Sequence, residues 1–557
     1  MYFIKNTMGS FRTLLPFSLI SLSLAQPYGT SKIQWGPCNK TEVPYEVPVE
    51  CAAIDVPFDY TQSNSSETLQ LDLVKVAAVV QPSKGSILLN FGGPGGTGRN
   101  ELCTKKLSEE LLALSGRQFD LIAFDPRGTS GSKIPIQCYE NQFDAWNFLI
   151  TYGPSNTSDT ELAKQWAQAA NVADVCSKSM AKYGSVVTSA FVARDMMRIV
   201  DALGEDGLLR YWGFSYGTTL GATTAAMFPD RVERMVLDGV QNPHEYYHAQ
   251  ADFEEWADSD KSFSAIFTGC VANRENCDLG KGNDKTAAEL EQSVWDLLDD
   301  LKARPRAIGP YTLSYAYLKS FIVRMLYNSG NWPALATLLN QILNGQPEDL
   351  EKSLTAIFGA YTNITDALAG IQQPQALYSI HCSDNMVRTK NFDDWVPAVQ
   401  RMYDTSRIIG DALVSLYAAC AQWKIEPKER YTGDFNVKTK NPVLFIGNSH
   451  DALTPLRSAK NVSSTFEGSV VLEVDGYGHA SLAAPSSCTI KTTSAYWVNG
   501  TLPPKDTICD SDGPLYGGVT WADVIAKVYG NGTAIAKRDV LHEPVIGGSL
   551  FPRVSFK

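Results

Sequence analysis

The segment Gly213-Phe214-Ser215-Tyr216-Gly217 constrains the fold of this 557-residue chain more than any other feature. An apolar run, "LLRYW", precedes it, and a run of small residues, "TTLGATTAAM", follows it. Isolated G-x-S-x-G matches are mostly ordinary turns. A serine turned sharply between a strand and a helix, however, is strained and needs small residues two before and two after it. We therefore expect a strand over 208–212, a helix over 218–227 and a nucleophilic Ser215 between them.

A serine nucleophile needs a general base and an acid that orients the base. On such an elbow the acid and then the histidine follow the serine along the chain. Apolar strands are expected over 443–446 and 470–474, and each is followed by a polar loop, the first with Asp451 and the second with His479. We predict a triad of Ser215, Asp451 and His479. The rival acid Asp475 stands only four residues before His479 and is expected to shape the turn. The remaining histidines are read as structural or surface groups: His244, His248, His381, His450 and His542.

A glycine-rich loop follows an earlier strand in "SILLNFGGPGGTGRN", residues 86–100. Gly93, Gly95 and Gly98 match the dinucleotide-binding pattern G-x-G-x-x-G, so a pyrophosphate cradle is one interpretation. Two observations oppose it. Pro94 removes a backbone donor, and the preceding segment 69–80 alternates like an exposed-edge strand, so this is not the first strand. The sequence favours a loop that holds the oxyanion of an acyl-transfer reaction.

The N-terminus predicts an exported protein. Lys5 and Arg12 precede or flank an apolar segment over 14–24, and Ser23-Leu24-Ala25 gives small residues at a cleavage spacing, so the mature chain is expected to begin near Gln26. No later stretch reaches the roughly 18 to 20 apolar residues of a membrane helix. The formal net charge of −12 and the lack of a basic run exclude nucleic acid as an expected partner.

The cysteines and the glycosylation sequons are consistent with an exported protein. The eleven cysteines contain no C-x-x-C pair, and no histidines cluster near them, so neither zinc nor another metal is expected. Proximity suggests five disulfides with Cys103 left free: Cys38–Cys51, Cys138–Cys176, Cys270–Cys277, Cys382–Cys420 and Cys488–Cys509. Sequons stand at Asn39, Asn64, Asn156, Asn363, Asn461, Asn499 and Asn531.

Several motifs together resemble one family. "NFGGPGGTG", "FDLIAFDPRGTSGS", "WGFSYGTTLG" and "DALTP" resemble the motifs of secreted tripeptidyl aminopeptidases, relatives of the prolyl iminopeptidases, and the likeness runs from about Trp35 to Cys509. Phe91 and Thr97 depart from the usual residues of the loop. The resemblance implies an α/β-hydrolase core and the triad named above. It also implies oxyanion donors on Tyr216 and Gly93, with Gly92 an equal claimant to Gly93.

The resemblance and the element pattern give a domain plan. The fold class is α/β: a mostly parallel sheet flanked by helices, with a large helical cap inserted in the middle of the chain. The cap acids Glu254, Glu255, Asp258 and Asp384 are candidates to hold a substrate amine, although each is also typical of a solvated helix face. The expected segments are a signal peptide (1–25), a first core part (26–240), the cap (241–435), a second core part with the acid and histidine loops (436–530) and a tail (531–557).

Two function classes follow from these features. The first is a secreted aminopeptidase that releases short peptides or proline from N-termini through an acyl-enzyme on Ser215. The second is a secreted esterase or lactone hydrolase that uses the same triad on a small metabolite. Both act on a peptide or small-molecule substrate without a cofactor. An amine anchor in the cap distinguishes the two.

Overall fold

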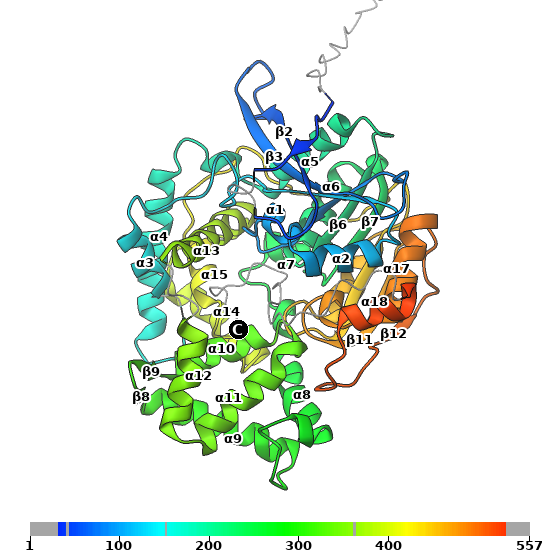
Figure 1. Cartoon of the computed structure of the whole chain (residues 1–557). Coiled ribbons are helices and arrows are strands. Elements are labelled where there is room, and N and C mark those ends of the chain that lie inside the picture. The colour runs from blue at the N-terminus through cyan, green and yellow to red at the C-terminus, as the bar shows by residue number, and fades with distance from the viewer. Residues whose placement is uncertain (1–31, 40–43, 151–152, 360–363, 531–557) are drawn as a thin grey trace, which may run out of the picture.

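A ten-stranded, mostly parallel sheet runs through the computed structural model, which describes residues 32–39, 44–150, 153–359 and 364–530 (Figure 1). Three antiparallel pairings join the first strands to one edge, and the remaining pairings are parallel. In spatial order the strands are β1 (Gly36–Pro37), β2 (Glu50–Pro57), β3 (Thr68–Val76), β5 (Asp120–Phe124), β4 (Ser86–Asn90), β6 (Leu209–Phe214), β7 (Val232–Asp238), β10 (Leu444–His450), β11 (Val470–Tyr477) and β12 (Ile508–Asp510).

The central strands are apolar because both faces of the sheet are covered. β4 is buried at every position. β3 alternates, but it is not the exposed-edge strand that its pattern predicts: it pairs with β2 on one side and with β5 on the other. The alternation reflects one well-covered face, while β1 and β2 form the edge of the sheet.

Helices cover each face and give each its own apolar core. On one face, side chains of the central strands pack with α2 (Lys105–Leu114), α17 (Ser487–Asn499) and α18 (Trp521–Tyr529). On the other, they pack with α5 (Ser189–Leu203), α6 (Tyr216–Met227) and α16 (Leu456–Ser464). The short α1 (Gly98–Leu102) follows the glycine-rich loop. The α/β architecture expected from the sequence is confirmed.

A helical region stands between β7 and β10, below the sheet in Figure 1. Two earlier helices, α3 (Gln142–Ile150) and α4 (Glu161–Ser179), pack against it, so the covering layer also draws on residues before 241. The inserted elements are α7 (Pro243–His248), α8 (Ser259–Ala272), α9 (Ala287–Ala303), α10 (Tyr315–Met325), α11 (Trp332–Asn344), α12 (Pro347–Gly359), α13 (Ile364–Asp384), α14 (Phe392–Thr405), α15 (Val414–Ala421) and the hairpin of β8 (Arg306–Ile308) and β9 (Tyr311–Leu313). We call these elements, from α7 to α15, the cap.

The structure forms the five disulfides that proximity in the sequence suggests, and Cys103 is buried with a free thiol. The sequons that lie within the described residues are exposed: Asn39, Asn64, Asn156, Asn461 and Asn499. The remaining predicted features lie outside the described residues: the signal peptide 1–25, Asn363, Asn531, His542 and the tail 531–557.

A search of the described residues finds no helix long and apolar enough to cross a membrane. Within the same ranges, no group of three or more His, Cys, Asp and Glu side chains is arranged to hold a metal ion.

Candidate active site

Ser215 occupies a strained turn between β6 and α6. Its backbone has φ 56° and ψ −128°, a conformation that L-residues rarely adopt. A Cβ atom on Gly213 would lie 2.2 Å from the carbonyl oxygen of Gly217, and one on Gly217 would lie 2.5 Å from that of Asn90. Both flanking positions therefore require glycine, as the sequence pattern indicates.

Asp451 and His479 stand just beyond the ends of two neighbouring parallel strands, β10 and β11. The Nδ1 atom of His479 lies 3.0 Å from one carboxylate oxygen of Asp451 and 3.2 Å from the other, and both residues are buried. With Asp451 ionised, the ring proton is on Nδ1, and this N–H donates a hydrogen bond to the carboxylate. Nε2 is buried and has no hydrogen-bond partner among the described residues. The ring thus keeps a lone pair free to take a proton.

The Asp451 carboxylate is held by several donors. One oxygen accepts from the backbone N–H of Leu453 at 2.8 Å and of Thr454 at 2.9 Å. The other accepts from the Thr454 hydroxyl and from the Ala480 N–H, each at 2.9 Å. Burial alone would raise the pKa of Asp451, but His479 and these hydrogen bonds hold that pKa below its usual value. Asp451 is therefore an ionised partner for His479.

The other acids near the histidine loop are arranged differently. The Asp475 side chain is 54% exposed and lies 3.9 Å from Nε2 of His450, so it does not orient His479. Asp238, at the end of β7, is fully buried and was not singled out from the sequence. Its carboxylate accepts from the N–H and the hydroxyl of Ser481, and burial raises its pKa to about 6. The only sequence signal was its place at a strand end in "VLDGV".

The glycine-rich loop packs directly against the serine turn. A Cβ atom on Gly92 would lie 2.8 Å from Cβ of Ser215. The N–H of Gly92 donates to the Asn90 side chain at 2.9 Å, whereas those of Gly93 and Tyr216 make no hydrogen bond to a described residue. Of the two neighbouring glycines, Gly93 is therefore the one whose backbone N–H makes no hydrogen bond to the described residues and can donate to an oxyanion. This favours Gly93 and Tyr216 as oxyanion donors.

All four candidate amine anchors accept hydrogen bonds within the protein. Glu255 accepts from the Gln241 side chain at 3.4 Å, and one oxygen of Glu254 is buried without a partner among the described residues. Glu254 accepts from the Asn461 side chain at 2.6 Å, and Asp258 accepts from Arg457 at 2.9 Å. Asp384 is fully buried, and its carboxylate accepts from the N–H and hydroxyl of Ser189 and from the Tyr246 hydroxyl. Burial raises the pKa of Asp384 to about 6.

The fourth candidate, Glu255, belongs to a cluster of acids. Burial, then Asp252, Glu245 and Asp451, raise the pKa of Glu255 well above its usual value. Asp252 was missed, although it lies in the same acidic run, "ADFEEWADSD". It is 2% exposed; one oxygen accepts from the Tyr417 hydroxyl at 3.3 Å, and the other has no partner among the described residues. Burial and the charge of Glu245 raise its pKa well above the usual value. An unpaired buried oxygen of this kind calls for a donor.

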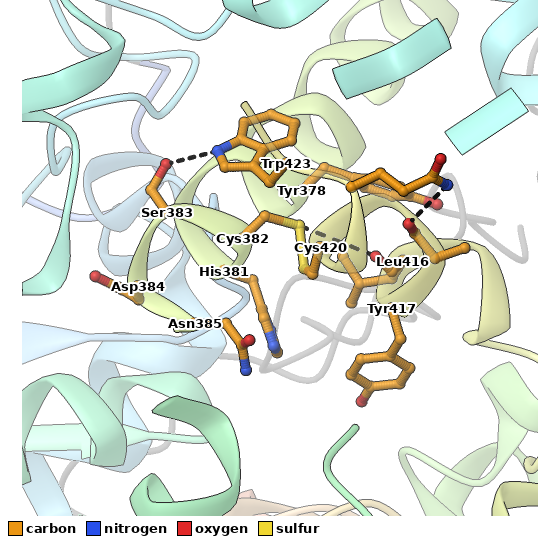
Figure 2. The surroundings of a disulfide bond; sticks show 12 residues. Tyr378, His381, Cys382, Ser383, Asp384, Asn385, Leu416, Tyr417, Cys420 and Trp423 are labelled. Carbon is orange, nitrogen blue, oxygen red and sulfur yellow. Dashed lines mark hydrogen bonds between the residues drawn. A yellow bond between two sulfur atoms is a disulfide. The ribbon is translucent and has the colours of Figure 1, made fainter. Parts of the chain in front are cut away.

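Side chains of α13 and α15 line the Asp252 side of this cluster. Nε2 of His381 lies 3.8 Å from Asp252 and has no hydrogen-bond partner in the described chain; burial lowers the pKa of His381 to about 3, so the ring is neutral. Figure 2 shows that His381 and Tyr417 project to the same side of the Cys382–Cys420 disulfide, whereas Asp384 points away from them. His381 therefore supplies no positive charge to the acid cluster.

Comparisons with known proteins identify related sequences. Residues 85–271 match the family model described as "alpha/beta hydrolase fold", and residues 406–509 match the one described as "TAP-like protein". The chain is 27% identical to "Serine protease Hip1" of Mycobacterium tuberculosis over 504 residues, which cover 87% of this chain and 92% of that protein.

Two further relatives carry different activities in their names. "Tripeptidyl aminopeptidase" of Streptomyces lividans is 26% identical over 483 residues, covering 83% of this chain and 84% of that protein. "Carboxylesterase B" of Mycobacterium tuberculosis is 26% identical over 479 residues, covering 82% and 86%. Among solved structures, an esterase from Exiguobacterium antarcticum is 11% identical with a TM-score of 0.32, covering 78% of this chain and 97% of that one.

Proposed function

Because the chain is an α/β hydrolase with a TAP-like C-terminal domain, distantly homologous to Hip1 serine protease and tripeptidyl aminopeptidase, we propose that it is a serine aminopeptidase. It would release short peptides or proline from the N-termini of peptides. The observation that carries the proposal is the pairing of His479 with Asp451 at 3.0 Å just beyond the ends of β10 and β11, on the same sheet whose strand β6 leads into the strained Ser215. The acid cluster of Glu245, Asp252 and Glu255 supports a substrate with a free amine.

The proposed reaction has two acyl-transfer steps. The Ser215 hydroxyl oxygen attacks the substrate carbonyl carbon while Nε2 of His479 takes the hydroxyl proton. The N–H groups of Gly93 and Tyr216 stabilise the oxyanion. The C–N bond breaks as His479 returns the proton to the leaving amine, which leaves an ester on Ser215. Water, deprotonated by His479, then attacks this ester, and the serine hydroxyl is regenerated.

The amine anchor is assigned to Asp252 and Glu255. Burial and neighbouring acids raise the pKa values of both carboxyls: Glu245 acts on Asp252, and Asp252, Glu245 and Asp451 act on Glu255. A protonated substrate amine relieves both effects, since it brings a positive charge and N–H donors to the unpaired oxygen of Asp252. Asp258 and Asp384 are already hydrogen-bonded elsewhere and are not needed as anchors. Glu254 accepts from Asn461 with one oxygen, and its other oxygen, which is buried without a partner among the described residues, makes it a secondary candidate.

The alternative is a secreted esterase or lactone hydrolase that uses the same triad. It is supported by the relative named "Carboxylesterase B", whose sequence identity to this chain, 26%, is the same as that of "Tripeptidyl aminopeptidase". An ester without an amine makes no use of a buried acid cluster, and this difference separates the two functions. For either function, the five disulfides are consistent with an oxidising, extracellular location.

The deciding experiment compares fluorogenic mono-, di- and tripeptidyl amides with free and acetylated N-termini, alongside a small neutral ester. Acetylation should lower kcat/KM for the peptides by roughly 30- to 1000-fold, because a partly desolvated charge contact is lost. Asp252→Asn and Glu255→Gln should remove most of this preference and leave ester turnover nearly intact. Asp258→Asn, whose carboxylate pairs with Arg457, is the matched control and should keep the preference.

Ser215→Ala is the companion control and should abolish peptide and ester turnover together. Equal cleavage of free and acetylated peptides by the wild-type enzyme would reject the aminopeptidase in favour of the esterase. Wild-type turnover by Ser215→Ala would reject both, because both need the same nucleophile.

A further inference from the structure

Asp238 connects the serine turn to the histidine loop. Its backbone oxygen accepts from the N–H of Ser215 at 3.1 Å. Its carboxylate accepts twice from Ser481, from the N–H at 2.8 Å and from the hydroxyl at 2.6 Å. Ser481 stands two residues after His479 and begins the short 3-10 helix η6 (Ser481–Ala483). One fully buried residue on β7 thus contacts the segments that carry the proposed nucleophile and base.

The backbone of the histidine loop has a positive φ on both sides of His479, and at Ala480 this is a strained conformation. Gly478 has φ 104°, and Ala480, which has a Cβ atom, has φ 61°. Such a conformation costs roughly 1–3 kcal/mol and persists only where surrounding contacts enforce it. The Asn448 side chain, on β10, restrains the residues before and after His479: it donates to the carbonyl oxygens of Gly478 at 2.9 Å and Ala480 at 2.6 Å. Immediately after Ala480, the two hydrogen bonds from Ser481 to Asp238, on β7, restrain the chain.

The charge of Asp238 also interacts with the proposed base and its acid. The titratable groups that act on its carboxylate are His479, which favours its ionised form, and Asp451, which opposes it. Glu255 acts on Asp451 from the cap side. When His479 takes the serine proton it becomes a cation, and an ionised Asp238 stabilises that cation over the neutral ring. The same residue therefore serves both geometry and charge.

We propose that Asp238 is a positioning residue of this hydrolase: it holds Ser481 so that the His479 ring faces Ser215, and its negative charge favours the protonated ring. The inference rests on the proposed Ser215, Asp451 and His479 triad. It does not depend on whether the substrate is a peptide or an ester, since both reactions pass through the same proton transfer.

The test measures turnover of p-nitrophenyl acetate and labelling of Ser215 by a fluorophosphonate between pH 5 and 9. Asp238→Asn preserves shape, removes the charge and replaces one of the two oxygens that accept from Ser481 with an NH2 donor, so it also loses a hydrogen bond that Ser481→Ala removes alone. The kcat of Asp238→Asn should fall roughly 10- to 100-fold with KM changed less than about two-fold, and the acidic limb of its pH–rate profile should move to lower pH. Ser481→Ala keeps the charge and removes one hydrogen bond; its kcat should fall about 5- to 20-fold with the limb unmoved.

Asp384→Asn is the matched control, because Asp384 also accepts from the N–H and hydroxyl of a serine, Ser189, in a fully buried site. His479 is not among the groups that act on Asp384. The acidic limb of this variant should stay at the wild-type position, which separates loss of a buried carboxylate from loss of the charge facing His479.

Three results decide the matter. Wild-type kcat and pH profile in Asp238→Asn would overturn the inference while leaving the hydrolase proposal intact. If Asp238→Asn does not fold, wild-type kcat in Ser481→Ala overturns it instead. Failure of the wild-type enzyme to be labelled at Ser215 would reject the proposed function itself, and so is distinguishable from both.

Discussion

At the scale of single residues, buried carboxylates distinguish this site from a simple triad. Asp238 and Asp384 are each fully buried, each is held by the N–H and hydroxyl of one serine, and burial raises each pKa to about 6. A raised carboxyl pKa means that the folded protein binds a proton more tightly than the unfolded chain does. Stability attributable to such a group is present at low pH and is lost as the pH rises from about 4 to about 6.

Asp384→Asn tests this linkage. Asparagine does not titrate, so between pH 4.5 and 7.5 the variant should gain roughly 2 kcal/mol in free energy of unfolding relative to wild type. Urea unfolding at the two pH values measures the difference. In the control Asp174→Asn the relative stability should stay constant, because hydrogen bonds from Lys178 and Lys424 lower the pKa of Asp174 to about 2. A pH-independent difference for Asp384→Asn would contradict the raised pKa.

The sequence predicted the residues whose role follows from their place at strand ends. Ser215, Asp451 and His479 each follow an apolar strand, and parallel strands bring their carboxyl ends to one edge of a sheet. Asp238 also ends an apolar strand, but nothing in its local sequence indicates that its carboxylate is buried, and Asp252 follows no strand. Asp252 is partnered by Tyr417, 165 residues later, and Asp238 by Ser481, 243 residues later. Burial that depends on such distant contacts leaves no local pattern in the sequence.

At the scale of elements, α13 and α15 link the cap to the proposed chemistry. A Cβ atom on Gly95 of the glycine-rich loop would lie 2.9 Å from Cβ of Ala376 on α13. The same helix carries His381 beside the acid cluster, α15 carries Tyr417, and Cys382–Cys420 joins the two helices. Neither α13 nor α15 was predicted from periodicity as a wall of the site, because α13 contains Pro374 and both are apolar on more than one side.

Two disulfides provide a matched pair for testing this link. Cys382–Cys420 and Cys138–Cys176 both join cysteines 38 residues apart. Removing either disulfide should therefore give the unfolded chain the same extra conformational entropy and lower the free energy of unfolding by about 4 kcal/mol. Cys382→Ser with Cys420→Ser should also weaken the preference for free N-termini, since Tyr417 and His381 lose their common support. Cys138→Ser with Cys176→Ser should lower Tm similarly and keep the preference. Calorimetry and the peptide panel measure the two effects, and an unchanged preference in both would contradict the link.

At the scale of the whole molecule, the cap touches both loops that carry the proposed chemistry. The carbonyl oxygen of Tyr327, between α10 and α11, accepts from the N–H of His479 at 2.8 Å. Its ring packs edge-on against the His479 ring, with centroids 5.5 Å apart. Together with the contact of α13 on the glycine-rich loop, this fixes the cap at two points over the site. We expect a cap held in this way to act as a wall past which a polypeptide substrate must enter.

This wall, combined with an acid cluster beside the triad, predicts strict cleavage from one end. An unstructured peptide of about 20 residues should yield a ladder of products shortened only at the N-terminus, because the protonated amine must reach Asp252 and Glu255 before a carbonyl reaches Ser215. Mass spectrometry of timed samples reads the ladder directly, and its step size gives the number of residues removed per cut. The same peptide acetylated at its N-terminus, or joined head to tail, should remain uncut, since neither offers a charged amine to the acid cluster. Internal fragments from the cyclic peptide would show that the cap admits a continuous chain, which the contacts of Tyr327 and α13 with the catalytic loops oppose.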